Sequence, residues 1–297
     1  MEPSSYGPFP NLPITRRKHF AWPDGNHLAL WVVPNLEYFR LDDPLPGIHN
    51  ERVPRTVARI PDVRSWAIRE YGNRVGVWRI FEVLSRYGIR GTAALNSDLC
   101  DFHPEIIAKA LESRWELMGH CQTNALRLNE MPPVQEHAAI SATLDRIALA
   151  TGARPKGWLG AGVAETWNTL DYLIEEGVEY VADWTCDDLP FGMKVGGRTI
   201  FSIPYTLEAS DSCQCYNQKA TADQFERVLT RQFDWLYRES EHTPRVMAIS
   251  LHPFIAGVPH WIGAVDAALE HICSHDGVWL ATGSEIVSHF ALQNIDE

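Results

Sequence analysis

The sequence predicts an α/β protein whose strands form a distorted parallel (β/α) barrel of about seven strands. Short apolar runs alternate along the chain with segments whose apolar residues recur at helical spacing. Regular alternation of this kind implies a parallel sheet covered by helices. Polar residues follow several of the apolar runs, and in such sheets the carboxyl ends of the strands are where ligands bind.

The elements follow in order. The run Leu-Ala-Leu-Trp-Val-Val at 28–33 is continuously apolar, as expected for a strand buried on both faces. A loop-like, proline-rich stretch covers 34–70, and a helix over 75–87 ends at Gly88. The strands predicted after it are 92–95, 115–118, 157–159, 178–182, 199–204, 246–251 and 278–281. The helices predicted after it are 104–111, 134–150, 166–175, 222–238, 263–272 and 284–292.

Composition narrows the class of protein. Residues 1–20 are expected to be an irregular segment and 21–297 a single barrel domain, because no linker or repeat interrupts the pattern. A net charge of -12 disfavours nucleic acid as a partner. No apolar run is long enough to span a membrane, residues 1–15 do not resemble a secretory signal, and six cysteines without a CxxC pair suggest reduced thiols. We therefore expect a cytoplasmic protein.

Two histidines at the ends of predicted strands suggest a hydrolytic site. His120 follows the strand at 115–118, and His252 follows the strand at 246–251. Other strand-end residues supply a carboxylate, amides and aromatic rings, which together make an enzyme-like inventory. These residues are Asn35, Glu37, Asn124, Trp158, Asp183, Trp184 and Tyr205.

The motifs around these residues resemble the polysaccharide deacetylase (NodB homology) family over most of the chain. The similar segments are 35–37, 119–120, 154–158, 187–191 and 203–207, with a Leu-His-Pro motif at 251–253. They are most similar to the branch of metal-independent allantoinases and cyclic-imide hydrolases. In the wider family, one Asp acts as a base, and a second Asp and two histidines hold a divalent metal.

The sequence departs from the family at the metal ligands. It has Glu37 and Tyr38 where the family has its two aspartates, and Asn124 where it has the second histidine. Catalytic zinc usually takes three protein ligands, and an amide or phenol replaces His or Asp poorly. We expect no tightly bound metal; if zinc binds, Glu37, His120 and Asn124 would hold it.

Without a metal, side chains must supply both the base and the acid. We expect Glu37 to be the general base, with a pKa raised by burial near Trp31 and Tyr38, and His252 to be the general acid. These two roles could be exchanged. His120 and Asn124 would orient the substrate or stabilise the oxyanion. Asp183 could orient one of the histidines.

A small cyclic amide, either an imide or a ureide, is the expected substrate. Asn35, Asn124 and Tyr205 would hydrogen-bond the ring, and Trp158 and Trp184 would stack on it. Allantoin itself is disfavoured, because the Gly-Arg-x-Ser piece of allantoinases reads Gly-Ala-Gly-Val-Ala-Glu at 160–165. The alternatives are a metal-dependent N-deacetylase of an amino sugar and a non-catalytic binding protein on a decayed barrel. The proline-rich N-terminal segment and the resemblance favour a homo-oligomer, either a dimer or a tetramer.

Overall fold

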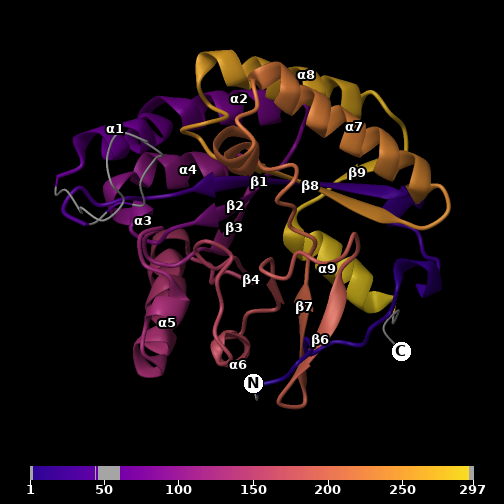
Figure 1. The fold of residues 1–297 in the computed structure, drawn as a ribbon, viewed down its shortest axis with the longest axis horizontal. Helices are drawn as coiled ribbons and strands as arrows, with labels where there is room; N and C mark the ends of the chain where they lie inside the picture. Colours follow the sequence, from indigo (N-terminus) through magenta and orange to yellow (C-terminus); the bar gives the residue numbers. More distant parts are fainter. Residues whose placement is uncertain (1–2, 44, 46–60, 294–297) are drawn as a thin grey trace.

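The computed structural model of the protein describes residues 3–43, 45 and 61–293. Within these residues nine strands form one sheet, in the order β6-β7-β5-β4-β3-β2-β1-β8, and β9 also pairs with β1. The sheet curls into a half-barrel, which confirms the predicted fold class (Figure 1). The strands are β1 (Leu28–Leu36), β2 (Thr92–Leu95), β3 (Glu116–Gly119), β4 (Gly157–Trp158), β5 (Tyr180–Val181), β6 (Phe191–Val195), β7 (Arg198–Ser202), β8 (Arg245–Leu251) and β9 (Val278–Leu280).

Helices cover the outside of the curl, and one helix lies inside it. Helices α2, α7 and α8 lie over β1 and β8, whereas α9 lies between β9 and β7 (Figure 1). The helices are α1 (Val63–Tyr71), α2 (Val77–Arg86), α3 (Leu99–Phe102), α4 (Pro104–Glu112), α5 (Pro133–Thr151), α6 (Thr169–Glu175), α7 (Ala222–Ser240), α8 (Pro259–Cys273) and α9 (Gly283–Leu292). No described helix is both long and apolar enough to cross a membrane.

Alternation along the strands separates an outer core from an inner one. In β1, Leu28 and Leu30 belong to the cluster that packs under the outer helices, whereas Trp31 and Val33 belong to the cluster inside the curl. Successive side chains in a strand point to opposite faces, so the odd positions of β1 face inward. Asn35 and Glu37 continue this inward series at the carboxyl end of β1. This alternation therefore places the Glu37 side chain on the concave side of the sheet.

The structure differs from the sequence-based expectation at β6, in the stretch at 34–70 and at the short helix α3. Strand β6 was not predicted; it pairs antiparallel with β7 at the edge of the sheet. The stretch at 34–70 is not all loop, since β1 continues to Leu36 and α1 begins at Val63; residues 44 and 46–60 lie outside the described part. The N-terminal segment packs on its own chain, because Lys194 N–H donates to Pro8 O at 2.7 Å and the ring centroids of Phe9 and Phe191 lie 4.6 Å apart.

Candidate active site

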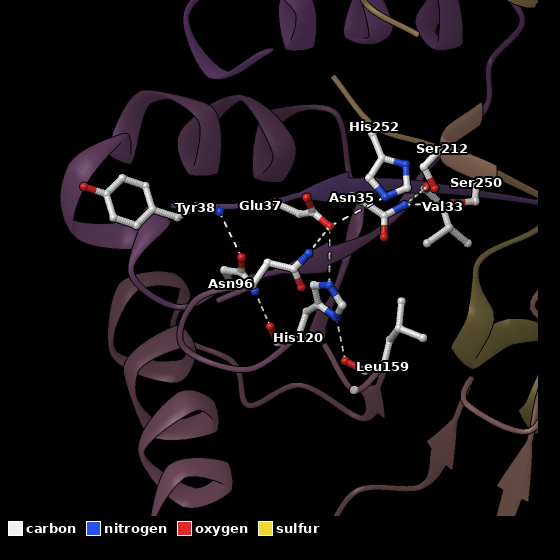
Figure 2. A network of polar contacts seen from close by, with 12 residues as sticks. Val33, Asn35, Glu37, Tyr38, Asn96, His120, Leu159, Ser212, Ser250 and His252 are labelled. Carbon is white, nitrogen blue, oxygen red and sulfur yellow. Dashed lines mark hydrogen bonds and ion pairs between the residues drawn. The ribbon is translucent and has the colours of Figure 1, made fainter. Parts of the chain in front are cut away.

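Three ionisable side chains converge at the carboxyl edge of the sheet. Glu37 follows β1, His120 follows β3 and His252 follows β8, and all three are buried. Glu37 Oε1 lies 3.8 Å from His120 Nε2 and 3.5 Å from His252 Nε2, with one imidazole on each side of the carboxylate (Figure 2). The strands that carry these residues are parallel, so their ends meet at one edge, as the position of the two histidines in the sequence suggested.

His252 is held by a carboxylate that the sequence analysis did not single out. Its Nδ1 lies 2.6 Å from Asp211 Oδ1. The other oxygen, Asp211 Oδ2, accepts the backbone N–H groups of His252 at 2.6 Å and Ala256 at 3.1 Å. Asp211 has no exposed surface. The imidazole therefore donates from Nδ1 and directs Nε2 towards Glu37. No motif spacing links positions 211 and 252, and only the folded chain reveals the pair.

Asn124 bonds to the carboxylate of Glu37. Its Nδ2 donates to Glu37 Oε1 at 2.6 Å, while its Oδ1 is buried without a partner among the described residues. Tyr38 turns away from this site (Figure 2) and stacks on Phe102, with ring centroids 4.6 Å apart. A backbone link from Tyr38 N–H to Asn96 Oδ1, at 2.9 Å, fixes the turn after β1.

The charges around Glu37 reverse the expected pKa shift. Burial by itself raises the pKa of Glu37, but His252, His120 and Arg69 together lower it below 4.5. The expectation that burial near Trp31 and Tyr38 raises this pKa was therefore wrong, because three cationic or imidazole groups surround the carboxylate. Burial by itself lowers the pKa of His252, but Asp211 and Glu37 raise it above 6.5. At neutral pH Glu37 is thus an anion, and His252 keeps its proton more firmly than an ordinary histidine.

Asn35 and Tyr205 meet at a serine beside this network. Asn35 Nδ2 donates to Ser250 Oγ at 2.9 Å, and Tyr205 Oη lies 2.6 Å from the same oxygen. Burial raises the pKa of Tyr205, so its phenol stays protonated. These polar groups are already bonded to one another, and they build the inner wall of the site.

The two tryptophans predicted to stack on a substrate lie elsewhere. Trp158 has no exposed surface and belongs to a third hydrophobic cluster, which also contains Leu144 and Leu170. Trp184 packs against the same cluster, and its ring contacts Phe9 edge-on at 5.7 Å. Gly119 pairs with Trp158 in the neighbouring strand, and paired residues point to the same face of a sheet. His120 comes one residue after Gly119 and points to the opposite, inner face, so Trp158 points outward. Trp158 therefore fills the core and does not line the site.

Asp183 does not bond either imidazole directly. Its Oδ1 accepts the backbone N–H of Gly160 at 2.8 Å, and His120 lowers the pKa of Asp183 electrostatically. Burial raises the pKa of Asp183 to about 7. His120 Nδ1 lies 2.6 Å from the carbonyl oxygen of Leu159, the residue before Gly160.

The donor set does not fit a catalytic divalent metal. Such sites need three protein ligands that offer free lone pairs. Here the Glu37 oxygen that faces both imidazoles already accepts the amide N–H of Asn124. The described residues contain no group of three or more His, Cys, Asp or Glu side chains that could hold an ion. The position of the second family histidine is thus filled by a hydrogen-bond donor.

A cavity of about 900 Å³ lies between the N-terminal segment and residues of β6, α7 and β8. Its lining includes Phe9, Asp187, Trp235 and, from the residues predicted for the site, Tyr205. It contains none of Glu37, His120 and His252. The ionisable residues at the strand edge and this cavity are therefore separate features of the surface.

Comparison with known proteins places this site in a class. No family model matches the chain. A "putative polysaccharide deacetylase" of Schizosaccharomyces pombe is 25% identical over 76% of this chain and 75% of its own. The crystal structure of a "probable polysaccharide deacetylase" from Pseudomonas aeruginosa PAO1 matches with a TM-score of 0.85 and 25% identity over 92% and 94% of the two chains. That of Puue allantoinase matches with a TM-score of 0.83 and 26% identity over 92% and 93%.

The protein is an enzyme that hydrolyses carbon–nitrogen bonds, of the deacetylase-like amidohydrolase type. The fold, the strand-edge histidines and the relatives agree on this class. In sequence and in fold the chain is similar to polysaccharide deacetylases of the NodB-like superfamily.

Proposed function

We propose that this enzyme opens the ring of a small cyclic amide, an imide or a ureide, without a tightly bound metal. The observation that carries the proposal is the 2.6 Å hydrogen bond from Asn124 to the oxygen of Glu37 that faces both imidazoles. This bond puts an amide N–H donor beside that oxygen, where a metal site would need a third ligand with a free lone pair. The structural likeness to an allantoinase, with a TM-score of 0.83, supports a ring-opening reaction.

In the proposed reaction, Glu37 takes a proton from a water molecule as the water oxygen bonds to the ring carbonyl carbon. His120 Nε2 accepts a hydrogen bond from the same water molecule and orients it, and the second N–H of Asn124 Nδ2 donates to the oxyanion that forms on the carbonyl oxygen. The carbon–nitrogen bond then breaks, and the nitrogen takes the proton from His252 Nε2. The product is an open chain with one carboxylic acid and one amide. The proton on Glu37 returns to His252 across the 3.5 Å between Oε1 and Nε2.

The pKa directions favour this assignment of roles over the exchanged one. A general base must be deprotonated at neutral pH, and the pKa of Glu37 is lowered. A general acid must hold a proton, and the pKa of His252 is raised by Asp211 and Glu37 against the effect of burial. The buried acceptor Asn124 Oδ1, which lacks a partner among the described residues, suits a ring N–H of the substrate.

The test is a substrate panel of hydantoin, succinimide, phthalimide, allantoin and an N-acetylamino sugar. Ring opening is followed by the loss of ring absorbance and by acid release, and deacetylation is followed by acetate release. The proposal expects turnover of at least one ring and none of the acetylated sugar. Acetate release with no ring opening would instead support a metal-dependent N-deacetylase, as the names of the deacetylase relatives suggest.

A matched variant separates this enzyme from a contaminant. Glu37→Gln keeps the size of the side chain but removes the base. The variant protein should fold, by circular dichroism, and should lose ring opening.

A further inference from the structure

One peptide group links His120 to a carboxylate. The carbonyl oxygen of Leu159 lies 2.6 Å from His120 Nδ1, and the N–H of the next residue, Gly160, donates to Asp183 Oδ1 at 2.8 Å. This C=O and this N–H belong to the same planar peptide unit. Asp183 therefore reaches His120 through two hydrogen bonds in series. A carboxylate at one end of such a chain polarises the peptide and strengthens the bond at the other end.

The approach of Asp183 to this peptide requires glycine at position 160. A Cβ on Gly160 would lie 2.6 Å from the backbone oxygen of Ala164 and 3.1 Å from Asp183 Oδ1. The loop itself is anchored, since buried Glu136 accepts the hydroxyls of Thr166 and Thr169. The peptide and the carboxylate thus meet in a fixed geometry.

A second carboxyl group, Glu165, lies close enough to Asp183 for the charge of Asp183 to raise the pKa of Glu165. Glu165 Oε2 accepts Trp184 Nε1–H at 3.1 Å, whereas Glu165 Oε1 and Asp183 Oδ2 are buried with no donor among the described residues. A proton on one of these two oxygens satisfies both. Burial and the charge of Asp183 raise the pKa of Glu165 well above its usual value, so Glu165 carries the proton.

We propose that Asp183 is a positioning residue for His120, and that it acts through the Leu159–Gly160 peptide to keep the imidazole protonated at Nδ1. Glu165 lowers the pKa of Asp183 against the effect of burial and so favours the charged form of Asp183. The hydrogen bond at one ring nitrogen decides which tautomer is present and where the other nitrogen points. His120 then presents the lone pair of Nε2 to the attacking water, whereas Asp211 directs the protonated Nε2 of His252 towards the leaving nitrogen. The inference deepens the proposed function and relies on it only for the kinetic test.

The first test is spectroscopic and needs no substrate. Ring nitrogens of the ¹⁵N-labelled full chain are assigned with His120→Asn, and the tautomer of His120 is read from two-bond ¹⁵N–¹H couplings. We expect protonated Nδ1 in the wild type and a mixed or reversed tautomer in Asp183→Asn, with His252 unchanged. Glu165→Gln should preserve the wild-type pattern of His120, because its amide donates to Asp183 as the neutral acid does. An unchanged His120 in folded Asp183→Asn would overturn the inference.

A second variant covers a failure of Asp183→Asn to fold. Glu165→Leu removes the donor to Asp183 Oδ2 and should disturb the His120 couplings, whereas Glu165→Gln should not. Identical His120 spectra for the two Glu165 variants would overturn the role of the pair.

The kinetic test asks whether Asp183 acts through His120. Asp183→Asn should lower kcat by about 10- to 100-fold, as loss of an outer hydrogen-bond partner does, and leave KM within about twofold. In the His120→Asn background the same substitution should cost nothing further. If the double variant instead loses kcat by the product of the two single-variant losses, Asp183 acts by a route that does not involve His120. If no substrate of the panel is turned over, the proposed function fails, but the spectroscopic test still decides this inference.

Discussion

Replacing Asp211 by Asn should slow the reaction strongly without unfolding the protein. The amide oxygen of Asn can still accept the two backbone N–H groups, of His252 and Ala256, that now bond to Oδ2. Its NH2 group then faces His252 Nδ1, which now donates to Oδ1 at 2.6 Å. Two donors cannot bond each other, so the imidazole must give up its Nδ1 proton and lose its charge.

The size of the effect follows from the bond that is lost. A hydrogen bond between charged groups contributes about 1.5–3 kcal/mol. At about 1.4 kcal/mol per factor of ten, kcat should fall by roughly 10- to 150-fold. KM should change little, because His252 acts on the leaving nitrogen and not on binding. The raised pKa of His252 should also fall, since Asp211 is one of the two groups that raise it.

The assay is the initial rate of ring opening across pH, for the wild type and two variants. The matched control is Asp234→Asn, because Asp234 pairs with His271 at 2.8 Å but is largely exposed. Exposed pairs contribute little, so the control should keep the wild-type rate. A kcat within twofold of wild type for folded Asp211→Asn would refute the reasoning that His252 is the acid and that Asp211 holds it.

Three further predictions concern the same edge of the sheet. Glu37→Gln should lower kcat by about 10²–10⁴-fold with circular dichroism unchanged, the usual loss for a missing general base, and activity within tenfold would exclude Glu37 from that role. Because the pKa of Glu37 is lowered, Glu37 should take up a proton and the rate should fall only at a pH below the ordinary glutamate pKa of 4.5. Because the pKa of His252 is raised, His252 should lose its proton and the rate should fall only at a pH above the ordinary histidine pKa of 6.5. A pH–rate profile of kcat/KM measures both losses. Asn124→His adds a third metal ligand beside Glu37 and His120, so the variant should bind zinc at least about tenfold more tightly than wild type in calorimetry. Equal zinc affinities would contradict the conclusion that Asn124 prevents tight metal binding.

The sequence sufficed for most strands because buried parallel strands appear as continuous apolar runs. Strand β6 was not predicted, because it lies at the sheet edge, pairs antiparallel and has an exposed Lys194, so its sequence is not a continuous apolar run. Helix α1 was missed because Val63–Tyr71 buries only Ser65 and Arg69, so no apolar stripe marks it.

The sequence predicted which residues lie at the strand ends. It did not predict which face of the sheet a side chain points to, or which residues distant in the sequence come into contact. Glu37 and the two histidines could be placed at one edge because parallel strands bring their carboxyl ends together. Trp158 was misplaced because β4 has two residues, too few to show which side chain faces inward. Asp211 and the lowered pKa of Glu37 were not predictable, since both depend on groups that only folding brings together.

The most direct test of the central claim is ring opening by enzyme whose metal content has been measured, with EDTA and after added zinc. Turnover should survive chelation, the metal content should be far below one ion per chain, and zinc should give no activation. Activity that disappears with EDTA and returns with zinc would contradict this expectation, and would mean that Glu37, His120 and Asn124 rearrange to hold an ion.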